Sequence, residues 1–399
     1  MTIGNVQRRT VIVAFLAFIG IGMSAGLLGL AWPSIREEFH LRLDAVNILL
    51  LFSTVTYTVA SFYIGRLMAR FGTGTTLLAG AIILSLCLFG IAASSTWALV
   101  IAFSTISGLG TGIIDAGLNM YVATYHSARQ MSWLHASFGI GITIGPLIMT
   151  FVLQQKLEWK LGYAVVGATL IIIILLIAMT RHVWRSEGLQ TSENKPVRRA
   201  SFAETFRVPV VWFSMATYFV YVGLEIGIGQ WAYTLLTESR GVAPEIAGPM
   251  VSVYWGAFTV GRIVFGIIAN RFRIERLLRN CMLAIIVGVV LFWWNPVQIV
   301  GFIGLVIIGV AQAPVFPLLM SDTAQRVGAE YAENGISMQM AAVGISSAIL
   351  PGLIGTIGAT FGLEAMAATF AIMAVIVFAF HELTILSRAK EPTLLSVGD

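Results

Sequence analysis

The chain has 399 residues, of which 58% are hydrophobic and only 11% are charged, whereas about a quarter of a soluble domain is charged. This composition excludes an ordinary water-soluble protein, because the apolar residues form long uncharged runs. The net charge of +5 does not indicate a nucleic-acid-binding protein, since the basic residues lie in short gaps and form no patch.

About twenty apolar residues cross the hydrocarbon layer of a bilayer, and runs of that length predict twelve transmembrane helices. The basic residues Arg8 and Arg9 precede the first run as in a signal peptide, but no small-residue cleavage site follows, so we interpret this run as the first helix. In chain order, the predicted helices cover residues 10–33, 44–66, 74–93, 97–122, 131–153, 160–180, 209–236, 246–269, 278–294, 297–320, 333–357 and 362–381.

The distribution of Lys and Arg predicts the orientation of these helices. The gaps on the side of the N-terminus hold 18 of the 24 basic residues, and the opposite gaps hold 5. Since basic residues concentrate on the cytoplasmic side, both termini are predicted to be cytoplasmic in a multi-pass protein of the cell inner membrane.

The longest polar stretch, residues 182–208, follows the sixth run and predicts a cytoplasmic linker. It divides the chain into a six-helix bundle at 1–181 and a second bundle at 209–399, which ends in a short cytoplasmic tail. Its basic residues are typical of a segment that lies against anionic lipid.

The two halves repeat one another, as in transporters built from duplicated helix bundles. In the fifth and eleventh runs, a glycine precedes a proline by seven residues, at Gly139 and Pro146 and again at Gly344 and Pro351. Further matches lie 201 residues apart, namely Gly65 with Gly266, Arg70-Phe71 with Arg271-Phe272, and Gly108 with Gly309.

The segment from Gly65 to Gly72 resembles the cytoplasmic loop motif of the major facilitator superfamily. The resemblance covers the whole chain and implies an all-α integral membrane fold in which two six-helix bundles rock about a central cavity. Ala69 stands where the motif has its usual Asp, and Asn270 holds the corresponding place in the second half.

Three further segments resemble the fucose–galactose–glucose proton symporters. They are Gly108-Leu109-Gly110 with Asp115 and Asn119, Leu134-His135-Ala136-Ser137-Phe138-Gly139 running to Gly145-Pro146, and Tyr254-Trp255-Gly256 followed by Gly261-Arg262. The resemblance implies that Asp115 matches a fourth-helix acid implicated in proton coupling. The acid that partners it in the first helix of those symporters is absent here.

Ionisable residues inside predicted membrane helices are candidates for function, because each costs several kcal/mol unless it faces a cavity or a partner. Asp115 and Asn119 lie four residues apart on one helix face with Gly108 and Gly112, and that face can line a cavity. The alternative for Asp115 is a permanent pairing with a neighbouring helix.

Glu225 lies near the middle of the seventh predicted helix, among glycines and with Tyr218 and Tyr221 on its side. A carboxyl group in so apolar a segment can carry a proton during a transport cycle. The alternative is a neutral acid that makes a hydrogen bond between packed helices.

Arg262 lies too deep in the eighth predicted helix to reach water comfortably. We expect an internal ion pair there, with an anionic substrate group as the alternative. His135 opens the fifth helix, where it either titrates during transport or is merely interfacial.

Sugars are bound by amides and aromatic faces, and the predicted helices supply several of both. Trp255 and Arg262, seven residues apart, share one face, whereas most membrane tryptophans are interfacial anchors. The candidate substrate ligands are Asn119, Gln230, Trp231, Tyr254, Trp255, Arg262, Gln312, Asn334 and Gln339.

The sequence therefore predicts proton-coupled uptake of a sugar or similar small polar solute, with Asp115, Glu225 and His135 as coupling residues. The alternatives are a proton-driven exporter, which requires a mostly apolar cavity, an organic-anion transporter that uses Arg262, and a non-transporting receptor. No enzyme motif, metal site or disulfide is predicted, and Cys87 and Cys281 are isolated in apolar runs. We expect a monomer in the bilayer, with a small-molecule substrate and no cofactor besides the coupling proton.

Overall fold

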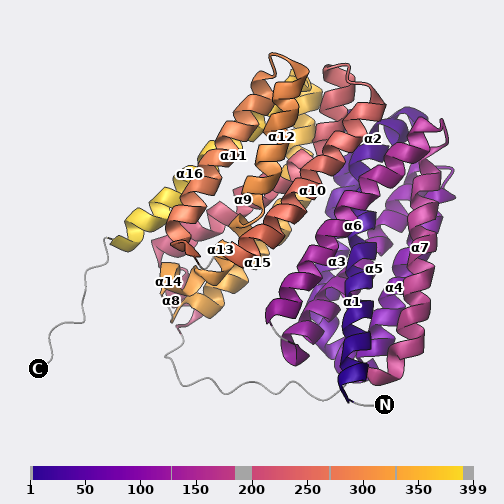
Figure 1. Cartoon of the computed structure of the whole chain (residues 1–399), viewed down its shortest axis with the longest axis horizontal. Helices are drawn as coiled ribbons and strands as arrows, with labels where there is room; N and C mark the ends of the chain where they lie inside the picture. Colours follow the sequence, from indigo (N-terminus) through magenta and orange to yellow (C-terminus); the bar gives the residue numbers. More distant parts are fainter. Residues whose placement is uncertain (1–2, 127, 185–199, 269–270, 329, 390–399) are drawn as a thin grey trace, which may run out of the picture.

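The computed structural model describes residues 3–126, 128–184, 200–268, 271–328 and 330–389 (Figure 1). Within these ranges the regular structure is helical, and twelve segments are long and apolar enough to span a membrane, which confirms the predicted number. Large apolar side chains such as Phe62, Met179 and Phe361 are more than 75% exposed, as expected for surfaces that face lipid.

The first bundle consists of six spans, the first of which is made of two consecutive helices. Its elements are α1 (Ile3–Ala25), α2 (Leu27–Glu38), η1 (Leu43–Ala45), α3 (Val46–Phe71), α4 (Thr73–Ala92), α5 (Trp97–Tyr125), α6 (Ala128–Gln154), α7 (Trp159–Thr180) and η2 (Arg181–Val183).

The second bundle repeats this order after the short helix α8 (Phe202–Thr205), and its fourth span is again made of two consecutive helices. Its elements are α9 (Pro209–Thr234), η3 (Leu235–Ser239), α10 (Pro244–Ile268), α11 (Ile274–Trp294), α12 (Gln298–Gln312), α13 (Val315–Ser321), α14 (Thr323–Val327), α15 (Ala332–Phe361) and α16 (Glu364–Ala389).

Several helices extend beyond the apolar runs that predicted them. Helix α3 continues to Phe71, α11 begins at Ile274, and α16 continues to Ala389. These extensions carry charged residues, because helical hydrogen bonding does not stop where the hydrocarbon layer ends.

Two spans are interrupted, one at a glycine and the other at a proline. Gly26 separates α1 from α2, and a Cβ atom there would lie 2.6 Å from the ring of Pro146 in α6. The tenth span breaks between Gln312 and Val315, where Pro314 lacks the N–H group that a continuous helix needs.

The glycines of α5 pack against α3. A Cβ atom on Gly108 would lie 2.1 Å from the backbone oxygen of Ser53, and one on Gly112 would lie 2.6 Å from that of Tyr57. These two glycines therefore line a close helix crossing rather than a cavity, because only a residue without a side chain allows the backbones to approach so closely.

The two bundles meet on the side of the molecule away from the start of α1 and the end of α16, and the helices diverge toward those ends (Figure 1). Arg36 forms an ion pair of 2.6 Å with Glu238, which joins α2 to η3. Asn47 donates a hydrogen bond of 3.3 Å to Thr356, which joins α3 to α15. We call this the closed side and the opposite one the terminus side.

Most of the predicted linker lies outside the described residues, including the segment 192–196 and the basic residues Arg198 and Arg199. Ala69 is exposed near the terminus-side end of α3, and Asn270 also lies outside the described residues. The loop motif lacks its usual acidic residue in both halves, because Ala69 and Asn270 hold that place.

Candidate functional site

Glu225 lies in the second half of α9 and belongs to a buried polar network of the second bundle. The Tyr221 hydroxyl oxygen lies 2.6 Å from Oε2 of Glu225, one helical turn away. The same oxygen lies 2.7 Å from the backbone oxygen of Gln312 at the end of α12. Tyr254 of α10 donates a hydrogen bond of 2.7 Å to Oε1 of Gln312. The Tyr254 hydroxyl oxygen also lies 3.2 Å from the backbone oxygen of Glu225, so residues of three helices converge around Glu225, although only Tyr221, of the described residues, hydrogen-bonds with its carboxyl group.

The geometry around Tyr221 depends on whether Glu225 carries a proton. A phenol has one proton and can donate it to only one of its two neighbouring oxygens. Both contacts are hydrogen bonds at the same time only if the Glu225 carboxyl group donates to Tyr221 while Tyr221 donates to Gln312. The network as observed therefore fits a protonated Glu225.

The break in the tenth span supplies one acceptor of this network. Gln312 is the last residue of α12, and the final carbonyls of a helix have no partner within that helix. The Tyr221 hydroxyl satisfies the Gln312 carbonyl instead. Interrupted helices at the binding site are typical of secondary transporters, because their free backbone groups can bind ligands and ions.

Arg262 lies on α10, six residues before the described end of that helix at Ile268. Its guanidinium carbon lies 4.2 Å from the ring centroid of Phe258, and its Nε atom is buried without a hydrogen-bond partner. It is within electrostatic range of Glu225 on α9 and of His135 on α6. The expected internal ion pair is absent, because no carboxylate of the described residues lies within 4.0 Å of the guanidinium.

His135 approaches the same region from the first bundle. Its side chain is exposed, and its ring meets the ring of Phe18 edge-on with centroids 6.0 Å apart. One turn farther along α6, a Cβ atom on Gly139 would lie 2.4 Å from the hydroxyl oxygen of Thr259. Helices α6 and α10 therefore touch next to Arg262.

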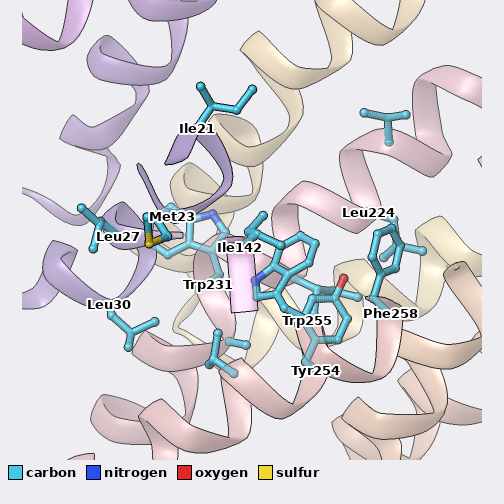
Figure 2. Close-up of a cluster of buried hydrophobic side chains, with 14 of the residues drawn as sticks. Ile21, Met23, Leu27, Leu30, Ile142, Leu224, Trp231, Tyr254, Trp255 and Phe258 are labelled. Carbon is cyan, nitrogen blue, oxygen red and sulfur yellow. The ribbon is translucent and has the colours of Figure 1, made fainter. Parts of the chain in front are cut away.

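The candidate tryptophans lie in an apolar cluster to which both bundles contribute, together with Met23 and Ile142 (Figure 2). Trp231 is fully buried and donates a hydrogen bond of 2.7 Å to the backbone oxygen of Pro351 in α15. Trp255 is 7% exposed and packs against Gly229 of α9.

Gln230 lies at the crossing of the two bundles. A Cβ atom on Gly29 of α2 would lie 3.1 Å from the backbone oxygen of Gln230, so no side chain fits there. The Nε2 atom of Gln230 is buried without a hydrogen-bond partner among the described residues.

Asp115 lies in a separate network within the first bundle. Its carboxylate accepts a short hydrogen bond from Tyr57 of α3 and one of 3.1 Å from Asn119. Both partners are donors, so they satisfy an ionised carboxylate without an added proton. Asp115 is thus paired with a neighbouring helix in this conformation, which is the alternative to a role in proton coupling.

Two of the predicted ligands make hydrogen bonds to the segment before α8 and to α9 rather than to Glu225. Asn334 donates to the backbone oxygen of Ala200, at 2.8 Å, and Gln339 donates to the hydroxyl of Ser214, at 2.7 Å. In this conformation these amides hold helices together at the terminus side.

The sequence reasoning missed a buried charged cluster beside these amides. Arg326 forms an ion pair of 2.6 Å with Asp322, and both side chains are at most 4% exposed. The Nδ1 atom of His381 lies 3.3 Å from the guanidinium. The four-residue spacing of Asp322 and Arg326 was the available signal, because it places opposite charges on one helix face.

The polar contacts to Asp115 and Glu225 were only partly visible in the sequence. Tyr221 stands one turn from Glu225 and was recognised by its spacing. Tyr57 was missed, because it precedes Asp115 by 58 residues and only helix packing brings the two together.

Comparison with known proteins agrees with this architecture. The family model described as Major Facilitator Superfamily matches residues 12–338. Two curated relatives match most of the chain. Bypass of stop codon protein 6 of Saccharomyces cerevisiae is 23% identical over 90% of this chain and 78% of its own length. The glucose/mannose transporter GlcP of Bacillus subtilis is 21% identical over 87% of this chain and 88% of its own.

Solved structures share the fold at low sequence identity. The nucleoside transporter NupG superposes with a TM-score of 0.78 at 13% identity, over 95% of this chain and 99% of its own. The fucose:proton symporter of E. coli superposes with a TM-score of 0.61 at 16% identity, over 94% and 98%. At these identities the superpositions establish the fold alone.

Proposed function

Because the chain belongs to the Major Facilitator Superfamily, we propose that it is a secondary transporter that couples uptake of a sugar or similar small polar solute to protons by alternating access. The observation that carries this proposal is the position of Tyr221 between Glu225 and the backbone carbonyl of Gln312. In that arrangement, the protonation of the Glu225 carboxyl group determines whether the Tyr221 hydroxyl donates to the carbonyl at the helix break.

Protonation of Glu225 changes the group to which the Tyr221 hydroxyl donates its hydrogen bond. With the proton present, Tyr221 donates to Gln312 and ties α9 to the end of α12. Without it, the charged carboxylate attracts the Tyr221 proton and Gln312 loses that bond, because charge-assisted hydrogen bonds are the stronger ones. Proton binding therefore alters the contact between α9 and the helix break after α12, inside the second bundle.

The polar character of this network supports a polar solute. Gln312 and Tyr254 lie beside Glu225, whereas an exporter of apolar drugs needs a mostly apolar cavity. The similarity to a glucose/mannose transporter favours a sugar as that solute. Asp115 is the second candidate for proton coupling, and His135 the third.

Orientation in the membrane can be tested with a single cysteine. We expect both termini and the linker to be cytoplasmic, because the basic residues are so unevenly distributed. A cysteine at Ser192 should react with an impermeant thiol reagent only after the cells are opened. Cys87 and Cys281 are buried and give a low background. Labelling of Ser192→Cys in intact cells would contradict this orientation.

Proton coupling and the direction of transport can be tested together. Addition of the transported solute to lightly buffered, de-energised cells that produce the protein should raise the external pH, because protons enter with the solute. An exporter that exchanges solute for protons gives no such inward flux when solute is added outside. Transport of a solute without any movement of protons would contradict the proposed coupling.

A further inference from the structure

We propose that the transported solute carries a single negative charge, which Arg262 binds, and that it crosses together with one proton so that no net charge moves. This inference rests on the proton-coupled function proposed above and specifies its substrate as a monoanion, such as a sugar acid. It follows from the hydrogen-bonding needs of Arg262 and Gln312 and from the charge of the site when Glu225 is ionised and when it is protonated.

Arg262 needs an anionic partner that the described residues do not supply. Its Nε atom is buried and makes no hydrogen bond, and no carboxylate lies within ion-pair distance. Contact with the Phe258 ring stabilises the cation only weakly compared with an ion pair. A guanidinium at membrane depth is costly unless a carboxylate or a similar group binds it, so an anionic solute is the fitting partner.

A second donor without a partner among the described residues belongs to the neighbouring helix α12. Gly261, the residue before Arg262, packs closely against Ala313, the residue after Gln312. The side-chain oxygen of Gln312 accepts the hydroxyl of Tyr254, while its Nε2 atom is fully buried and without a partner. The Gln312 amide is closed off from solvent in this conformation, so it offers this donor to a hydroxyl group of the solute only when the helix break after α12 opens.

The site also faces the first bundle, as a transport site must. Thr259, one turn before Arg262, touches Gly139 of α6, and His135 of α6 lies within electrostatic range of the guanidinium. A solute bound to Arg262 therefore lies beside both bundles and can affect how they close around it.

Charge balance fixes the valence of the solute. When Glu225 is ionised, its charge offsets that of Arg262 across a distance longer than an ion pair. When Glu225 is protonated, as the observed network fits, the charge of Arg262 is unbalanced without a solute. In the loaded form, a protonated Glu225 and a monoanion on Arg262 again give a neutral site. The ionised, unloaded form and the loaded form both keep the surroundings of Arg262 and Glu225 neutral, whereas a neutral sugar with a proton leaves a positive charge at that site.

The test uses the purified full-length protein in proteoliposomes. The probes are D-glucose as the neutral solute, D-glucuronate, D-gluconate and L-lactate as monoanions of different sizes, and glucose 6-phosphate as a dianion. Uptake is measured under an imposed pH gradient and, separately, under a potassium diffusion potential. We expect at least one monoanion to accumulate with the pH gradient, at a rate that a potential of either sign leaves unchanged.

Arg262→Gln should bind that monoanion roughly 30-fold more weakly or worse, because loss of one partner of a buried charge pair costs about 2 kcal/mol or more. Its melting temperature without solute should equal that of the wild type, since no internal ion pair is lost. The matched control is Arg271→Gln, an exposed arginine just beyond α10, which should bind normally.

Other outcomes would refute the monoanion, the charge balance, the role of Arg262 or the proton-coupled function. Potential-driven uptake of glucose would refute the monoanion and retain the proton-coupled function, and preference for the dianion would refute the charge balance. Arg262→Gln with a lowered melting temperature and intact binding would assign Arg262 an internal role. Absence of proton-coupled uptake of every probe would refute the proposed function together with this inference.

Discussion

Glu225→Gln is expected to abolish accumulation of solute against its gradient while exchange without a gradient continues. A pH difference of one unit supplies about 1.4 kcal/mol per proton, enough for roughly tenfold accumulation by the wild type. The accumulation ratio of the variant should fall to about one, because an amide cannot carry the proton. The amide keeps the shape of the side chain and its hydrogen bond with Tyr221, so the melting temperature should change little.

The matched control is Glu245→Gln, an exposed carboxyl group in the first turn of α10, which should accumulate solute normally. Asp115→Asn should also weaken accumulation, but this variant disturbs the hydrogen bonds that the carboxylate accepts from Tyr57 and Asn119. An amide nitrogen at residue 115 would face either the donating amide of Asn119 or the Tyr57 hydroxyl, which would then have to accept instead of donate. Normal accumulation by Glu225→Gln would show that another group carries the proton.

Gly29→Leu is expected to hold the protein open on its closed side and to stop transport. A Cβ atom on Gly29 would lie 2.9 Å from the backbone oxygen of Gly229, so a leucine forces α2 away from α9. Overpacking of this kind costs about 1–3 kcal/mol, which shifts a two-state equilibrium roughly 5- to 150-fold. Spin labels on cysteines at Glu37 and Glu245 should report a longer distance across the closed side.

The control for this variant is Gly266→Leu, because a Cβ atom at this glycine of α10 meets nothing within 4 Å. It should show the wild-type distance and the wild-type rate of transport. If Gly29→Leu leaves the distance unchanged, the close crossing of α2 and α9 does not control opening, and the ion pair between Arg36 and Glu238 becomes the next contact to test.

The number of spans, the repeat and the family could be predicted from the sequence, because each depends on local information. Uncharged runs of about twenty residues reflect the thickness of the hydrocarbon layer, and the structure confirms twelve of them. Glu225 was recognisable for the same reason, since a carboxyl group within such a run stands out without knowledge of its neighbours.

Only the tertiary structure decided which polar side chains meet. Gln312, Asn334 and Gln339 are alike as amides in apolar helices, yet only Gln312 lies beside Tyr254 and Tyr221. Tyr221 and Gln312 are 91 residues apart, and their contact depends on how α9, α10 and α12 pack. The unpaired state of Arg262 likewise became visible only with every neighbouring carboxylate in place, because an ion pair requires a distance of a few ångströms that no single helix specifies.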